Sequence, residues 1–109
     1  MSHEQYQACI DECLKCMQAC NHCYDACLEE SHIEAMKECI RLDRECADLC
    51  GFAAHAMSMR SSYSSEICRI CAEICEACGN ECAKHDHDHC KRCAEACLEC
   101  AKACRAMAV

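Results

Sequence analysis

Cysteine recurs along this chain at alternating steps of three and four positions, a spacing that marks one face of an α-helix. Three segments carry the complete pattern. Their cysteines are Cys9, Cys13, Cys16, Cys20, Cys23 and Cys27; Cys68, Cys71, Cys75, Cys78 and Cys82; and Cys90, Cys93, Cys97, Cys100 and Cys104. Residues at this spacing form a stripe like the a and d positions of a heptad. Mainly Glu, Lys, Arg, Asp, Gln and Ala lie between them, so the pattern predicts three amphipathic helices.

A fourth helix is predicted where cysteine is sparser. Its stripe runs through Met36, Cys39, Asp43 or Leu42, Cys46, Cys50, Ala53 and Met57. Asp43 falls on this stripe only if the register steps by four from Cys39. We expect Asp43 instead to be a surface residue beside Arg41 and Arg44.

Capping signals and breaks place the helices at about 4–29, 32–58, 64–84 and 87–107. Ser31 to Glu34 has capping-box spacing, a serine-rich run covers 58–65, and Asp86 or Asp88 is expected to cap the last helix. Gly51 and Gly79 fall inside helices, which we expect them to loosen or kink. The first and third connections are short, so the helices that they join must be antiparallel. The predicted fold is all-α: an antiparallel up-down-up-down four-helix bundle with a cysteine-lined core, in a single domain over 1–109.

Composition and charge narrow the functions. The net charge is −8, with Lys and Arg mixed among Glu and Asp, which argues against nucleic acid or an anionic membrane as a partner. The N-terminal segment lacks the basic start and apolar stretch of a secretory signal, so we expect a cytoplasmic protein. Cytosolic thiols are kept reduced, and the odd number of nineteen cysteines cannot all pair internally. Metal binding is therefore favoured over a disulfide framework.

Cysteines three or four apart on a helix have Cβ atoms about 5–6 Å apart, close enough for one ion to bridge their sulfurs. Zinc sites usually use four ligands per ion, whereas a continuous row of sulfur suits Cu(I) ions that share thiolates. Copper at about one ion per sulfur would also balance the thiolate charge. We predict that all nineteen cysteines bind multiple Cu(I) ions and that the metal-free protein is already folded. The alternatives are zinc or iron–sulfur binding, a dithiol/disulfide redox function, and simple packing of buried cysteines.

Histidine and methionine gather at one end of the predicted bundle. The residues are His32, Met36, His85, His87 and His89. We predict His85 and His89 as metal ligands in a copper-uptake mouth; the alternative is a solvated polar turn. Whether Asp43, Met36 and His87 bind metal is left open, and His3, His22 and His55 are expected to take no part.

A second apolar row lies beside the cysteine stripe of two helices. It comprises Ile10, Leu14, Met17, Tyr24 and Leu28, with Ile67, Ile70 and Ile74 as a counterpart. One interpretation is ordinary widening of the core-facing stripe, and the other is an interface between copies of the chain.

The whole chain resembles the copper storage protein family, specifically its cytosolic members. The resemblance rests on the stripe from Cys9 to Cys27 and on three motifs: CIRLDREC (39–46), CAEICEACGNEC (71–82) and KHDHDHC (84–90). It implies a four-helix bundle that forms a homotetramer, stores Cu(I) along its core, takes up copper at one end and is not an enzyme. The proteins that deliver or remove copper are not identified by the sequence.

Overall fold

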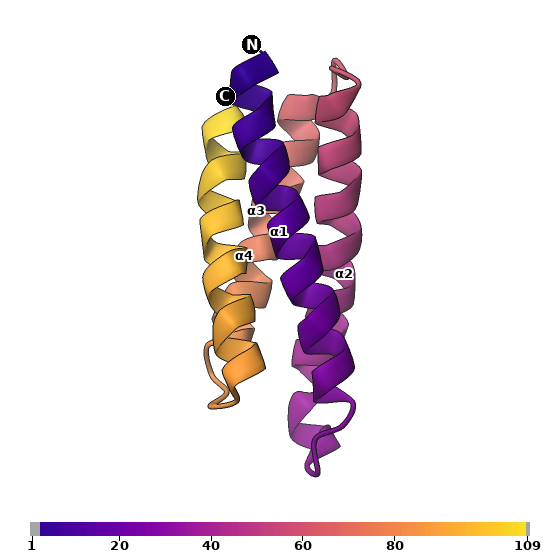
Figure 1. The fold of residues 1–109 in the computed structure, drawn as a ribbon, viewed down its shortest axis with the longest axis vertical. Helices are drawn as coiled ribbons and strands as arrows, with labels where there is room; N and C mark the ends of the chain where they lie inside the picture. The colour runs from indigo at the N-terminus through magenta and orange to yellow at the C-terminus, as the bar shows by residue number, and fades with distance from the viewer. Residues whose placement is uncertain (1–2, 109) are drawn as a thin grey trace.

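The computed structural model describes residues 3–108, which form four helices packed side by side along a common axis (Figure 1). α1 spans His3–Cys27, α2 Ile33–Ser58, α3 Ser64–Cys82 and α4 Asp88–Met107. α1 and α3 each pack against both α2 and α4, so the helices form a square in cross-section. The bundle is 46 Å long and 18 Å wide. The predicted up-down-up-down topology is confirmed.

The two halves of the bundle differ in length. α1 and α2 have 25 and 26 residues, whereas α3 and α4 have 19 and 20. The termini lie together at one end, and at the opposite end the α1–α2 turn reaches beyond the α3–α4 turn (Figure 1). Residues near the α1–α2 turn therefore overhang the end of the shorter hairpin.

The helix bounds differ from the predicted ones by at most two residues. α1 and α3 each stop two residues early, because the backbone tightens into a turn. There the N–H of Glu30 donates to the carbonyl of Cys27 at 3.2 Å, and the N–H of His85 donates to that of Cys82 at 3.1 Å.

The predicted helix caps are wrong. His32 and His87 occupy the N-cap positions of α2 and α4, and neither side chain makes a capping hydrogen bond. Ser31 therefore lies one position too early to cap α2. Asp88 is instead the first residue of α4, where its carboxylate meets the positive end of the helix dipole.

Sulfur fills the interior of the bundle. All nineteen cysteines are at most 1% exposed. The other buried apolar residues of the described chain are alanines, Ile10, Met36 and Met57. Cysteine thus takes the place that leucine and isoleucine hold in an ordinary helix bundle, behaving as a small buried hydrophobe.

Gly79 permits a close approach of α3 and α4. A Cβ atom at this position would lie 2.8 Å from Cγ of Leu98 and 3.2 Å from Cβ of Cys97. At Gly51 a Cβ would meet only the flexible end of Met17, at 3.2 Å. Both helices continue through their glycines without a break.

Candidate metal centre

The nineteen cysteines form one connected group of free thiols inside the bundle, which we call the sulfur core. Within a helix, sulfurs four positions apart make contact, as in Cys23–Cys27 at 3.7 Å. The shortest contacts are between helices, with Cys39–Cys82 at 3.2 Å and Cys20–Cys97 at 3.5 Å. The row of sulfurs along each helix is therefore connected to the rows of the other helices, and the closest sulfur–sulfur contacts are those between helices.

Metal-sized groups of sulfur recur along the axis. In at least five sets of four thiols, all the sulfur atoms lie within 4.8 Å of one another. They are Cys13, Cys71, Cys100 and Cys104; Cys16, Cys46, Cys50 and Cys75; Cys16, Cys20, Cys46 and Cys97; Cys20, Cys78, Cys93 and Cys97; and Cys23, Cys27, Cys39 and Cys90. The three sets in the middle share members, so these are overlapping sites rather than separate tetrahedra. This arrangement suits metal ions that share thiolates more than isolated zinc sites.

Burial favours the protonated form of the thiols. At the end of the core near the α1–α2 turn, burial raises the pKa of Cys90 to about 12 and also raises the pKa of Cys27. An apolar environment disfavours a thiolate, so these thiols stay neutral at pH 7. A metal ion that binds them must displace their protons.

Asp43 corrects the prediction made from the sequence. It is fully buried, not on the surface, because the register does step by four from Cys39 and then by three to Cys46. Cys78 and Cys93 each donate to its Oδ1 atom at 3.3 Å. Burial, reinforced by the surrounding thiols, raises the pKa of Asp43 to about 10, so its carboxyl group is protonated at neutral pH.

His89, which was predicted as a metal ligand, contacts the sulfur core. Its Nδ1 atom lies 3.4 Å from the sulfur of Cys23 and 3.6 Å from that of Cys90. On the other side of the ring, Nε2 lies 2.9 Å from Oε2 of Glu30. The hydrogen bond from His89 lowers the pKa of Glu30, so this carboxylate stays ionised. It can hold Nε2 as the donor and leave the Nδ1 lone pair facing the thiols.

Three other residues that the sequence analysis singled out, His85, His87 and Met36, lie at this end of the bundle. Nε2 of His85 contacts Glu81, near the end of α3, at 3.1 Å. His87 is exposed, stacks on His89 and lies 3.4 Å from Glu30. Met36 is buried, 2% exposed.

Of the remaining histidines, His22 lines a surface pocket together with His89, and His32 lies in the α1–α2 turn at the same end of the bundle. His22, His32 and His55 are exposed, as is typical of solvated residues. The side chain of His3 lies outside the part of the chain that the structure describes.

Glu30 is the functional candidate that sequence reasoning missed. It comes from the turn after α1, whereas the histidines that it contacts are 57 and 59 positions later in the chain. No local spacing signals such a contact.

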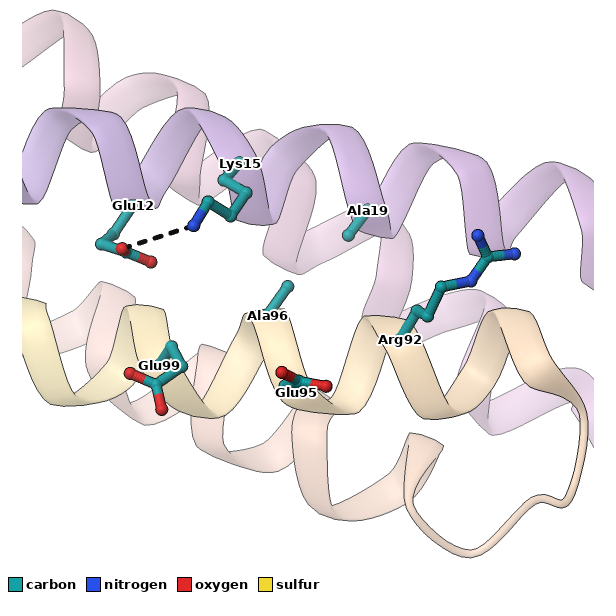
Figure 2. Close-up of a pocket in the computed structure, with 7 residues that line it drawn as sticks. All are labelled: Glu12, Lys15, Ala19, Arg92, Glu95, Ala96 and Glu99. Atoms are coloured by element: carbon teal, nitrogen blue, oxygen red, sulfur yellow. Dashed lines mark ion pairs between the residues drawn. The ribbon is translucent and has the colours of Figure 1, made fainter.

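The outer surface between α1 and α4 carries a shallow hollow (Figure 2). It is lined by Glu12, Lys15, Ala19, Arg92, Glu95, Ala96 and Glu99. Ala19 and Ala96 extend toward the space between the helices, and Lys15 pairs with Glu12 at 3.6 Å (Figure 2). These are solvated charges over two small side chains.

Within the described residues, no helix is long and apolar enough to span a membrane.

Comparisons with known proteins agree with this geometry. The model of the copper storage protein family matches residues 2–109. The curated protein YhjQ of Bacillus subtilis, described as an uncharacterized cysteine-rich protein, is 60% identical over 70 residues. That alignment covers 63% of this chain and 65% of YhjQ, so the chain spans just under two thirds of that relative.

Solved structures match over nearly the whole chain. A Cu(I)-bound copper storage protein, BsCsp3, is 58% identical with a TM-score of 0.93, covering 96% of this chain and 99% of that one. Apo-Csp3 from Bacillus subtilis is 59% identical with a TM-score of 0.91, covering 94% and 98%. A cytosolic copper storage protein from Streptomyces lividans is 43% identical with a TM-score of 0.93, covering 97% and 93%. The cysteine-filled bundle and these matches together establish that the chain belongs to the copper storage protein family.

Proposed function

We propose that this protein stores Cu(I) ions in its sulfur core, with all nineteen cysteine thiolates as ligands. The observation that carries this proposal is the overlap of the three middle four-thiol sets, which share Cys16, Cys20, Cys46 and Cys97. A site that shares its ligands with its neighbours suits an ion that needs only two or three thiolates. The cargo is therefore many monovalent ions rather than a few divalent ones.

Charge balance gives the chemistry of loading. Each thiol that becomes a ligand releases one proton, and each Cu(I) brings one positive charge. At about one ion per sulfur the loaded core is neutral, so the cost of burying thiolates is removed. Zinc at the same density would leave a large positive charge inside the bundle. This favours copper over zinc.

Copper enters at the histidine mouth, which we define as Glu30, His85, His87 and His89. His89 is the residue that links solvent to the sulfur core, because its ring contacts the partly exposed Glu30 on one side and Cys23 on the other. Imidazole and then thiolate bind Cu(I) in succession, and the stronger thiolate ligands draw the ion inward. His85, on the facing side of the opening, is the second histidine ligand.

The fold is expected to change little on loading. The thiols already lie at bridging distance, and the chain matches a Cu(I)-bound relative and an apo relative with similar TM-scores, 0.93 and 0.91. Copper binding therefore requires small side-chain movements rather than folding of the bundle.

The proposal includes a cytosolic location and a homotetrameric state. A cytosolic location fits the reduced thiols that Cu(I) binding needs. A homotetramer fits the apolar side chains that remain on the surface, including Leu14, Phe52 and Ile70, which are 43–52% exposed. The second apolar row thus widens the core and also contributes to the interface between copies of the chain. Ile10 is buried, and Met17, Ile67 and Ile74 pack against the core. The exposed members of the row face another copy of the chain. No catalytic step is proposed.

A dithiol redox function is less compatible with the geometry. Such an enzyme needs a reactive thiolate that a substrate can reach. Here the thiols are at most 1% exposed, and burial raises the pKa even of Cys27 and Cys90, which lie at the open end.

An anaerobic titration of reduced protein with Cu(I), in competition with a chromophoric chelator, tests the proposal. We expect uptake to saturate near one ion per cysteine, with unchanged helicity by circular dichroism and no displacement of copper by excess Zn(II). The variant Cys46→Ser/Cys97→Ser removes two shared ligands and should lower the capacity by at least two ions while the bundle stays helical. Saturation at one or two ions would contradict storage.

A further inference from the structure

A buried thioether lies at the end of the sulfur core opposite the histidine mouth. Met57 is 1% exposed and continues the α2 stripe at steps of three and four, after Cys50 and Ala53. Its position in the register is one that cysteine holds elsewhere on the same stripe. The sulfur of Met57 is therefore placed as part of the core by the same geometry that places the thiols.

The thioether contacts a layer of thiols from the other three helices. Its Sδ atom lies 3.7 Å from Sγ of Cys68 on α3, which donates its S–H to it. Cys68 also interacts with the thiols of Cys9 on α1 and Cys104 on α4. The sulfurs of Cys9 and Cys104 lie 3.8 Å apart. Four sulfurs, one from each helix, thus close this end of the core.

A thioether differs from a thiolate in one way that matters here. Both are soft ligands that Cu(I) prefers, but methionine binds without a proton to lose and without a negative charge. At the last layer a fourth thiolate would add a charge with no further copper ion beyond it to offset that charge. A neutral donor completes the coordination at this layer without that cost.

The geometry points to Met57 as a Cu(I) ligand that, together with Cys68, binds the terminal ion of the core. This inference rests on the proposed copper storage and adds a twentieth sulfur ligand to it. A metal ion replaces the hydrogen of Cys68 in the contact between the two sulfurs: the S–H bond breaks, the Cys68 sulfur and the Met57 sulfur each bond to Cu(I), and the proton leaves to solvent.

Selenium absorption spectroscopy can test this directly. The six methionines are replaced by selenomethionine, the reduced protein is loaded with Cu(I) to saturation, and the surroundings of selenium are measured by extended X-ray absorption fine structure. We expect a selenium–copper path at bonding distance that is absent from the metal-free sample. It should be lost in Met57→Leu, which conserves volume, and kept in Met17→Leu, whose side chain packs on the outer side of Gly51.

The outcomes separate this inference from the function on which it rests. Copper uptake near one ion per cysteine with no selenium–copper path would overturn the role of Met57 and leave storage intact. A path that keeps its full amplitude in Met57→Leu would overturn it too, by assigning the contact to another methionine. Failure of the wild-type protein to take up copper would overturn storage itself. The absence of a path from the wild-type spectrum would overturn the inference even if Met57→Leu does not fold.

Discussion

Oδ1 of Asp43 lies 3.3 Å from the sulfur of Cys93, in a part of the core where its other contacts are also thiols. A carboxyl group in such surroundings is stable only when protonated or when it meets a positive charge. Its pKa is raised from the ordinary 3.8 to about 10, chiefly by burial. At neutral pH the carboxyl group of Asp43 is therefore protonated in the folded metal-free protein, whereas it would be ionised in the unfolded chain.

The pH dependence of stability follows from this shift. Between about pH 4 and pH 10 the folded metal-free protein holds a proton on Asp43 that the unfolded chain has released, so the free energy of unfolding falls as the pH rises. Asp43→Asn cannot titrate and should lose less stability over this window. We expect it to gain more than about 1.4 kcal/mol over wild type between pH 5 and pH 8, the equivalent of one pKa unit. Urea denaturation of reduced, metal-free protein measures this, and identical slopes for both proteins would contradict it.

The pairing of His89 with Glu30 predicts a defect in the first step of loading. Glu30→Gln should weaken the affinity for the first copper equivalent by about tenfold, since outer partners of a metal-ligating histidine typically contribute about 10- to 100-fold. His89→Ala should have a larger effect on that equivalent and on the rate of uptake, with the total capacity unchanged. Stopped-flow absorbance and chelator competition measure both. His55→Ala, exposed on α2, is the control, and an equal effect there would exclude a special role for this end.

The two glycines should respond differently to alanine. Gly79→Ala forces the Leu98 side chain and Cβ of Cys97 away from α3, so we expect a loss of about 1–3 kcal/mol of stability, as for other overpacked cores. Gly51→Ala displaces only the end of Met17 and gains helix propensity, so a gain of about 0.5–1 kcal/mol is expected. Thermal denaturation of both variants, metal-free, tests the contrast. Equal effects of the same sign would show that the α3–α4 approach is not tight.

Arg60 predicts a stabilising change in the turn between α2 and α3. Its φ of 56° is in the left-handed region, and the next N–H, of Ser61, donates to the carbonyl of Ala56 at 2.9 Å. This is the position after a helix where glycine is preferred. Arg60→Gly should raise the free energy of unfolding by about 0.5–1 kcal/mol, because relief of the left-handed strain exceeds the added entropy of the unfolded chain. Arg60→Ala, which keeps a Cβ atom, should show no such gain in denaturant titrations.

The cysteine stripes could be predicted because a helix converts spacing into a shared face. Every stripe cysteine is buried, and the antiparallel order followed from the two short connections. Asp43 shows where this reasoning fell short. The choice between Leu42 and Asp43 was a choice between hydrophobicity and register, and flanking arginines suggested a surface position. Register decided, because Cys39 and Cys46 on either side fix the face that residue 43 presents.

The histidine mouth was predicted only in part for a different reason. Spacing places a side chain on a helix, but His85, His87 and His89 surround a connection whose path is set by contacts across the bundle. Nothing in the local sequence says that Glu30 meets His89 at 2.9 Å, or that His85 pairs with Glu81. Such distant contacts depend on how far the α1–α2 hairpin projects, which follows from helix lengths known only to within a turn.

Sulfur atoms 3.2–4.0 Å apart are spheres in contact, and spheres in contact leave holes between them. Metal sulfide minerals hold their cations in such holes. On this comparison, the amount of copper the bundle accepts is a property of the packing, and it grows with the length of the sulfur column. Lengthening all four helices by one heptad should therefore add capacity in steps, with no new binding motif required.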